Sequence, residues 1–514
     1  MSKTIIVIGA GLAGLSAALQ AAENGCNVKL VSSFPSERAQ SVMAEGGINA
    51  ALNTKDENDS PEEHFTDTIK AACGLADPNA VWGMTQAAPE LVHWLLKLGV
   101  QFNMSGYDDV DLRNFGGQKK KRTAFAQSDT GKQIMTAMID AVRRKEASGM
   151  VERFSHHSFL TLRLCDNICC GCVIRDEYSQ ETVELPGDAV IVATGGMHGL
   201  FGNTTGSLSN TGEVTAELFR LGVPLANGEM IQYHPTTVKC GGKRMLISEA
   251  ARGEGGRLFA MKDGKQWYFM EEKYPELGNL MPRDITAREI WKVSHESEVF
   301  LDMTEISDEI ISNKLSGLAE DCMTYLHKDI RKEPVSVLPG IHYFMGGILV
   351  DEQHRTPIQN LYAAGECCAQ YHGANRLGGN SLLGALYGGR VAAKSACEQA
   401  DVVDLSCATQ IDFPPASQIS EIKQLNKVMQ ETMGVVRNEN TLLNGIQTVQ
   451  ALTGNLALLG MAVLKSALAR KESRGAHWRE DYPKSNDDDY LKTTVARFDG
   501  KQIQISFVPV PERR

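Results

Sequence analysis

The chain opens with a short apolar run followed by a glycine-rich segment. Residues 4–8 (TIIVI) form a short apolar run that predicts a buried strand. The glycine-rich segment GAGLAG follows at 9–14, and the pattern over 15–23 predicts a helix. A second apolar run at 27–31 predicts the next strand. Strand, glycine turn, helix and strand in this order are the context in which G-x-G-x-x-G predicts a dinucleotide site.

Each glycine of this turn has a distinct expected task. Gly9 permits the tight turn, Gly11 lets the backbone approach a pyrophosphate, and Gly14 lets the helix pack on the strand. The acid that usually binds a ribose about 20 residues further on is absent, because Ser32 and Ser33 stand at that place. A serine hydroxyl or the backbone is therefore expected to contact the ribose.

Two later strand patterns also end in glycine. The run 189–193 leads into Thr194-Gly195-Gly196, and the run 361–364 leads into Gly365-Glu366. Both could approach a cofactor, so the nucleotide-binding part is expected to be discontinuous, with an insertion between about 235 and 350. From about residue 406 the pattern predicts long helices, and the final stretch is polar and charged.

The segment 372–390 (HGANRLGGNSLLGALYGGR) predicts a loop that opens a helix. Glycines 378 and 379 allow a tight turn, and Asn380 or Ser381 can cap the first amides. Such a helix start is also an anion or carbonyl-oxygen site. Taken alone, the segment is more simply explained as an ordinary junction that carries one surface arginine, Arg376.

Length, charge and cysteine content narrow the class of protein. With 514 residues the chain is too long for one core, and its net charge of −11 argues against nucleic acid or an anionic membrane surface as partner. No signal-peptide pattern precedes the first strand, and the longest apolar stretch, 452–469, is interrupted by polar residues. Twelve cysteines form no paired CxxC motif. A cytoplasmic protein with reduced thiols and no metal site is expected.

The basic run 119–122 is interpreted as a solvated face.

The predicted insertion holds the densest polar chemistry of the chain. His234, the Ser248-Glu249 pair with Arg252, Arg283 and His342 all lie near glycine-rich turns. For any one of them a salt bridge or a satisfied core group is the simpler account. Together with Arg376 they indicate a site for a small dicarboxylate, because arginine forks and imidazoles can bind two carboxylates.

These segments together resemble the flavoprotein subunits of fumarate reductases and succinate dehydrogenases, in the FAD-dependent oxidoreductase 2 family. The similarity extends over nearly the whole chain, through GAGLAG, AEGGINAA, RNFGG with RTAFA, ATGG, HPT, EAARGEGG, PRD, HYFMGG, GE, HGANRLGGNSL and RKESRGAH. The related L-aspartate oxidase shares PRD and HGANR but typically differs at the segments that read HYFMGG and NRLGGNSL here.

The resemblance implies an α/β fold in which a Rossmann-like FAD-binding domain carries an inserted α+β capping domain and a C-terminal helical domain. The expected bounds are 1–233 and 350–405 for the FAD-binding domain, 234–349 for the capping domain, and 406–514 for the helical domain with its polar tail. By the same resemblance, FAD is bound by Gly9, Ala10, Gly11, Gly14, Ser32, Gln40, Ser41, Ala44, Gly46, Gly47, Glu213, Glu366, Ser381 and Leu382.

The resemblance also implies a dicarboxylate substrate, fumarate or succinate. Its carboxylates are expected to contact a set of five residues, namely His234, Ser248, His342, Arg376 and Phe115. Flavin N5 would pass hydride to one alkene carbon, Arg283 would protonate the other, and Glu249 and Arg252 would relay protons to Arg283. Because an arginine normally keeps its proton, this role requires a proton chain that restores its charge at once.

One departure from the family pattern concerns the flavin linkage. Many members bind FAD covalently through a histidine in a segment like RSHTVxAQGG, and this chain has Gln40 at that position. FAD is therefore expected to be non-covalent. Losing an electron-withdrawing imidazole should lower the flavin potential, which favours fumarate reduction over succinate oxidation.

The electron donor and the exact activity stay open at this point. An iron–sulfur partner subunit is expected, with a soluble donor as the alternative, and membrane association would come through partner subunits rather than direct insertion. The competing hypotheses are an L-aspartate oxidase of NAD biosynthesis, an enzyme for another small enoate, and a non-enzymatic flavoprotein. The last would not need Arg283, His342 and Arg376 together.

Overall fold

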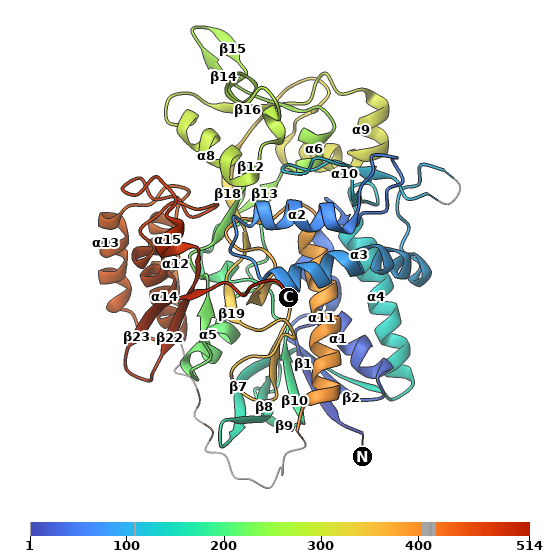
Figure 1. Ribbon diagram of the computed structural model, residues 1–514, viewed down its shortest axis with the longest axis vertical. Helices are drawn as coiled ribbons and strands as arrows, with labels where there is room; N and C mark the ends of the chain where they lie inside the picture. The colour runs from blue at the N-terminus through green and yellow to red at the C-terminus, as the bar shows by residue number, and fades with distance from the viewer. Residues whose placement is uncertain (1, 107–108, 402–410, 412, 414–417) are drawn as a thin grey trace.

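A five-stranded parallel sheet carries the N-terminal part of the chain. The computed structural model describes residues 2–106, 109–401, 411, 413 and 418–514. The strand order is β20-β10-β1-β2-β6, and every neighbouring pair is parallel (Figure 1). The strands are β1 (Thr4–Ile8), β2 (Asn27–Ser32), β6 (Val151–Ser155), β10 (Ala189–Val192) and β20 (Leu361–Ala363). The predicted strand, glycine turn and helix are confirmed.

Alternation along β1 gives this sheet two apolar faces. Ile5 and Val7 belong to one buried cluster, whereas Ile6 and Ile8 belong to another, because successive side chains of a strand point to opposite faces. Helices cover the first face, namely α1 (Leu12–Glu23), α3 (Pro78–Leu98), α4 (Thr130–Ala147) and α11 (Asn380–Gln399). A small antiparallel sheet covers the second, with β7 (His157–Cys165), β8 (Ile168–Asp176) and β9 (Thr182–Pro186).

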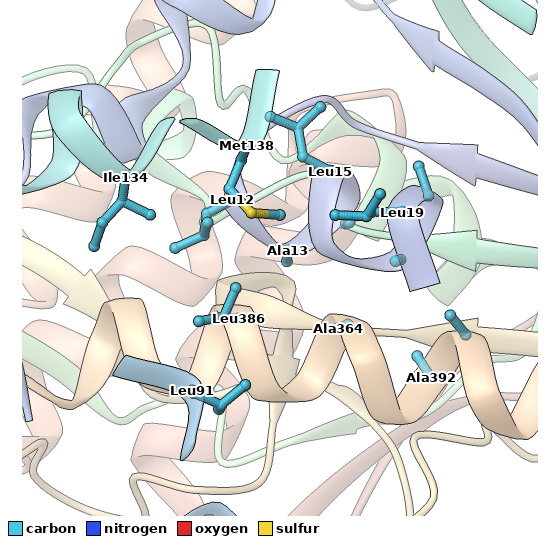
Figure 2. Packing of buried hydrophobic residues seen from close by; sticks show 14 of the residues in the cluster. Leu12, Ala13, Leu15, Leu19, Leu91, Ile134, Met138, Ala364, Leu386 and Ala392 are labelled. Carbon is cyan, nitrogen blue, oxygen red and sulfur yellow. The ribbon is translucent and has the colours of Figure 1, made fainter. Parts of the chain in front are cut away.

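Helix α1 lies between two other helices in the first cluster. Figure 2 shows Leu12 and Leu19 of α1 on the side of Leu386 and Ala392 of α11, with Met138 of α4 across from them. Small residues line the contact between α1 and α11: a Cβ added at Gly389 would lie 2.3 Å from the carbonyl oxygen of Ala13. This close packing fixes the two helices relative to each other, and the starts of both border the site described below.

Between β10 and β20 the chain leaves the parallel sheet and builds a separate core at the top of Figure 1. Two antiparallel sheets form it. The first contains β12 (Ile231–Cys240), β13 (Lys243–Leu246) and β18 (Leu338–Phe344), and the second β14 (Arg257–Lys262), β15 (Lys265–Trp267), β16 (Val299–Asp302) and β17 (Val335–Ser336). Its helices are α6 (Glu249–Gly253), α7 (Phe269–Lys273), α8 (Arg283–Val293), α9 (Asp308–Lys314) and α10 (Ser316–Asp321).

The C-terminal part is helical, as predicted, but it ends in a β-hairpin. The helices are α12 (Ile419–Thr432), α13 (Glu439–Gln450), α14 (Asn455–Ala469) and α15 (Asp487–Tyr490). The hairpin of β22 (Lys492–Phe498) and β23 (Ile503–Pro509) joins β11 (Leu225–Ala226), β19 (Gly347–Leu349) and β21 (Cys368–Ala369) in one sheet. Alternation of half-buried and exposed residues along β23 explains why this tail looked merely polar in the sequence.

The remaining elements connect these parts. They are α2 (Pro61–Ala71), α5 (Glu213–Arg220), the short strands β3 (Ile48–Asn49), β4 (Leu112–Arg113) and β5 (Thr123–Ala124), and short helical turns η1 (Ser36–Arg38), η2 (Gln40–Met43), η3 (His198–Leu200), η4 (Gly278–Leu280), η5 (Cys322–Leu326) and η6 (Gly365–Cys367). The division into four parts at 233, 349 and 405 is retained as a proposal, and the residues on both sides of the last boundary lie outside the described residues.

One interpretation of the sequence is wrong in part. The basic run 119–122 was expected to be a solvated face, and its three lysines are exposed or half-buried. Arg122, however, is fully buried and pairs with Asp59 and Asp67, each at 2.9 Å. A buried guanidinium requires such partners because an isolated charge in the interior is very costly. The two carboxylates lie about 60 positions earlier in the chain, so no local pattern indicated them.

Candidate functional site

A cavity of about 530 Å³ lies between the parallel sheet and the inserted segment. It opens at the carboxyl ends of β1, β2 and β10, where ligands of open α/β sheets bind. All of the predicted cofactor, substrate and catalytic residues line it except Gly14 and Arg252. Gly14 packs against Gly9, and Arg252 bonds Glu249, so both stand directly behind the lining.

The turn between β1 and α1 is built for close backbone approach. Gly9 has a φ of +109°, and a Cβ added at Gly14 would lie 1.8 Å from the carbonyl oxygen of Gly9. Helix α1 begins without a side-chain cap and without an acidic residue in its first turn. Its free amides and helix dipole therefore suit a pyrophosphate.

Several buried polar atoms in the cavity wall have no partner among the described residues. Ser32 Oγ at the end of β2 is one, which fits the prediction that a serine replaces the usual ribose-binding acid. Glu45 Oε2 is another, and burial, with Asp321 adding to it, raises the pKa of this carboxyl to about 8. These atoms and the glycine turn fit the hydroxyls, phosphates and polar ring edge of FAD.

Gln40 and Glu366 face the cavity from opposite walls. Gln40 Oε1 accepts a hydrogen bond from the backbone amide of Ser207 at 2.6 Å, and Glu366 Oε1 accepts one from Phe344 N at 3.1 Å. Gln40 thus joins the η2 turn to the loop before α5. Ser41 lies close to the start of α1, where its Oγ accepts from Leu12 N at 3.3 Å.

The first residues of α11 line the cavity, but the helix is not capped in the way that the sequence suggested. The N-cap is Gly379 in the left-handed region, and no side chain caps the helix. The Asn380 side chain turns away to Asn49, Thr68 and His64. The proposed capping by Asn380 or Ser381 is therefore wrong, and the first amides of α11 stay available beside Ser381 and Leu382.

At the other end of the cavity Arg283, Glu249 and Arg252 form a buried chain of ion pairs. Arg283, at the start of α8, donates to Glu249 Oε2 from Nε at 2.8 Å and from Nη2 at 2.6 Å. Glu249 Oε1 accepts from Arg252 at 3.1 Å. Burial alone would raise the pKa of the Glu249 carboxyl, but the guanidinium groups of Arg283 and Arg252 outweigh it and hold that pKa below its usual value.

Two histidines and a third arginine complete this end. The rings of His234 and His342 meet edge to face with centroids 5.1 Å apart, and burial, followed by the neighbouring charges, lowers the pKa of each well below its usual value. Arg376 lies 4.3 Å over the Tyr343 ring, and burial, with Arg283 adding to it, lowers its pKa to about 9. Ser248 is the N-cap of α6, and Phe115 is buried against Gly46.

Sequence reasoning missed several polar residues that hold this arrangement. Gln232 Oε1 accepts from Arg283 Nη1 at 3.1 Å, while its Nε2 donates to Arg376 O at 2.8 Å. Gln118 and Asn49 donate to Gly378 O at 2.9 Å and 2.7 Å. A signal existed for Gln232 alone, because it precedes His234 by two residues on β12, so that both point to the same side of that strand.

Comparison with known proteins identifies the class. Residues 4–382 match the family described as FAD binding domain, and residues 452–513 match the fumarate reductase flavoprotein C-terminal family. Together with the cavity, these matches make the protein an FAD-dependent oxidoreductase. The predicted α/β fold and the predicted FAD cofactor are confirmed.

Individual relatives narrow this class further. The succinate dehydrogenase flavoprotein subunit of Bacillus subtilis is 38% identical, with 100% of this chain and 98% of the relative covered. The 8-methylmenaquinol:fumarate reductase flavoprotein subunit of Wolinella succinogenes is 32% identical over 100% and 92% of the two chains. The structure of a variant of quinol fumarate reductase FrdA from E. coli superposes with a TM-score of 0.89, at 27% identity over 99% and 97%. The chain belongs to the family of succinate dehydrogenase and fumarate reductase flavoprotein subunits, as the resemblance implied.

None of the helices in the part of the chain that the structure describes is long and apolar enough to cross a membrane.

Proposed function

We propose that this protein reduces fumarate to succinate as the flavoprotein subunit of a reductase complex. The observation that carries the proposal is the placement of Arg283. It lies on the cavity wall with Glu249 directly behind it, and His234, His342 and Arg376 line the same end of the cavity. A dicarboxylate bound by the last three would place its central carbons near a protonated guanidinium.

The charge of this end suits a dianion. The three guanidinium groups of Arg252, Arg283 and Arg376, in and directly behind this part of the wall, outnumber the two carboxylates of Glu249 and Glu366. The two histidines, with their lowered pKa values, are neutral and offer N–H donors without further charge. Excess positive charge and neutral donors in a desolvated pocket favour a small substrate with two carboxylates.

Reduction of the double bond requires one hydride and one proton, which add to the two alkene carbons and give the saturated dicarboxylate. FAD, when bound, supplies the hydride. Arg283 uses one N–H on Nε and one on Nη2 for Glu249, and one on Nη1 for Gln232. Two of its five N–H groups therefore remain free for the substrate carbon.

The chain behind Arg283 restores its proton. Glu249 Oε2 is within 2.8 Å of two nitrogens of Arg283, and Glu249 Oε1 continues to Arg252. Arg252 in turn donates to Asn279 O at 2.6 Å, toward the η4 turn. Because Glu249 is ionised and holds no proton of its own, it would take one from Arg252 at Oε1 as it returns one to Arg283 from Oε2, and Arg252 would regain its proton from solvent after turnover.

We propose further that FAD is held without a covalent bond. Gln40 has no nucleophilic ring nitrogen, and its amide is occupied by Ser207 N. Acid precipitation should therefore release all of the flavin into the supernatant. Flavin fluorescence that stays with the precipitated polypeptide would contradict this part of the proposal.

Electrons would come from a partner subunit that carries iron–sulfur clusters. The names of the relatives, which are flavoprotein subunits, support this, and so does the lack of paired CxxC motifs in this chain. A lower flavin potential without the covalent bond supports the direction from fumarate to succinate. The L-aspartate oxidase alternative is not favoured by the relatives.

The test is a comparison of substrates on the purified, FAD-loaded protein. Oxidation of a reduced viologen dye should depend on fumarate and should greatly exceed succinate oxidation measured with an acceptor dye. Maleate, the cis isomer of the same charge, is the control for geometry and should react much more slowly. Comparable rates in both directions would overturn the proposed direction, and turnover of L-aspartate alone would overturn the substrate.

A further inference from the structure

The two histidines of the cavity differ in what supports their second ring nitrogen. His342 Nδ1 lies 2.8 Å from the hydroxyl oxygen of Thr205, a residue of a distant loop. Among the described residues, the hydrogen-bond partners of His234 Nδ1 are atoms of Thr236 in its own strand, at 3.1 to 3.5 Å. The orientation and proton position of His342 therefore depend on one side chain that is separate from its strand.

The proton position matters because His342 is neutral. Burial, His234, Arg283, Arg376 and His198 all lower its pKa, in that order. A neutral imidazole has one N–H, and it can donate to a carboxylate through Nε2 only when Nδ1 is the bare nitrogen. A hydroxyl that donates to Nδ1 enforces this tautomer. The Thr205 hydroxyl lies 3.4 Å from its other acceptor, Ile341 O, and 2.8 Å from Nδ1, which leaves it able to donate to Nδ1.

Hydrogen bonds to neighbouring segments hold the loop that carries Thr205. Thr205 N donates to Ile341 O at 3.0 Å, and Arg244 N donates to Thr204 O at 3.2 Å. Thr204 Oγ1 lies 3.1 Å from Nδ1 of the buried His198. The His198 ring lies so close over Gly206 that a Cβ there would be 2.2 Å from it. The two backbone hydrogen bonds hold Thr205 in place before any ligand binds, and the Thr204 hydroxyl adds to the stability of the loop.

We propose that Thr205 is a positioning residue that holds His342 as a neutral Nε2–H donor for one carboxylate of the bound dicarboxylate. The inference rests on the proposed function, because it assumes a dicarboxylate in this cavity. It adds a determinant of affinity that does not itself contact the reacting carbons.

The test compares Thr205→Val, which has nearly the same shape but no hydroxyl, with Thr205→Ser, which keeps the hydroxyl. Fumarate is titrated into each oxidised, FAD-loaded protein, where binding occurs without turnover. Thr205→Val should raise the Kd at least about tenfold, the effect of losing one hydrogen bond to a charged group. Thr205→Ser should recover most of that loss. In turnover, the KM for fumarate should rise in the Val variant while kcat changes little.

Thr204→Val is the matched control, because it removes the same atoms one residue away, where the hydroxyl meets His198 rather than His342. It should lower the melting temperature with little change in Kd. FAD content and melting temperature verify that each variant is folded. Equal Kd values for Thr205→Val and Thr205→Ser, or an equal loss in Thr204→Val, would overturn the inference alone. If wild type does not bind fumarate, the proposed function fails, and this inference fails with it.

Discussion

The two ends of the cavity are built from different parts of the polypeptide. At the flavin end the wall is mainly backbone: the turn at 9–14, the glycines after β10 and the uncapped start of α11. At the opposite end, where we propose that the dicarboxylate binds and which we call the dicarboxylate end, it is mainly side chains, with Glu249, Arg283 and Arg376 buried together. The first end offers backbone amides, which bind an anion although they carry no net charge. The second end holds charged side chains that are shielded from water.

This difference separates binding from chemistry. Backbone amides and a helix dipole bind a pyrophosphate but do not exchange protons during a reaction. Arg283 is buried and pairs with the carboxylate of Glu249. Electrostatic interactions are strong where water is excluded, so a buried guanidinium that is paired with a carboxylate can take part in proton transfer. Changes at the flavin end should therefore affect FAD content, and changes at the dicarboxylate end should affect turnover.

The largest effect is expected at the flavin end, from Gly14→Ala. The added Cβ would lie 1.8 Å from Gly9 O, and backbone cannot give way as a flexible side chain does. The variant should be purified essentially without FAD, as measured by the ratio of flavin to protein absorbance. Gly242→Ala adds the same methyl group where nothing lies within 4 Å, and it should retain full flavin. Normal flavin content in Gly14→Ala would contradict the account of this turn.

Arg283→Lys should have the next largest effect, at the other end. It keeps the charge but replaces a planar fork by a single point. If Arg283 donates the proton, kcat should fall by about a hundredfold or more, with little change in KM for fumarate and normal FAD content. Arg376→Lys should instead raise KM as well, because a carboxylate clamp is lost. A kcat of Arg283→Lys within about tenfold of wild type would remove it from the catalytic residues.

A smaller effect is expected from a matched pair of buried amides, one at each end. Gln232→Leu removes the acceptor of Arg283 Nη1, and kcat should fall by about tenfold, or about 1.4 kcal/mol of barrier. Gln118→Leu removes a donor to Gly378 O beside α11 and should weaken FAD binding instead. Steady-state kinetics and FAD titration of the apoprotein measure both quantities. If each variant changed both quantities alike, the two ends would not be separable as described.

The smallest expected effect concerns pH and His64, which supports the flavin end through Asn380. Burial, with Arg122 adding to it, lowers the pKa of His64 to about 3. Between that value and its unfolded pKa of about 6.5, only the unfolded chain binds the proton, so acidification destabilises the folded state. From pH 7 to about pH 5.5 this residue should cost about 1 kcal/mol. In urea unfolding, the free energy of unfolding of His64→Gln should fall by about 1 kcal/mol less than that of wild type between pH 7 and about pH 5.5. An identical decrease in both proteins would contradict the lowered pKa of His64.

The features that could be predicted from the sequence are those whose residues are contiguous. The turn at 9–14 and the segment 372–382 contain both the signal and the function within one short stretch, because a glycine turn followed by a helix start is a local property. The positions of Arg283, His234 and His342 in one cavity came from the resemblance to a known family. Neither strand alternation nor spacing would have brought them together.

The features that could not be predicted depend on contacts across the fold. Arg122 was interpreted as exposed because its two carboxylate partners lie far away in sequence. The cap of α11 was misassigned because Asn380 binds Asn49 and Thr68 rather than its own helix. Thr205 and Gln232 gained importance only when their distances to His342 and Arg283 were known.

A single-turnover reaction tests the central claim most directly. The FAD-loaded protein is reduced chemically without air, separated from excess reductant, and mixed with about one equivalent of fumarate, without partner or dye. The account predicts that the flavin is reoxidised and that succinate forms in an amount equal to the flavin, much faster in wild type than in Arg283→Lys. A flavin that stays reduced in the wild-type protein after fumarate is added would contradict it.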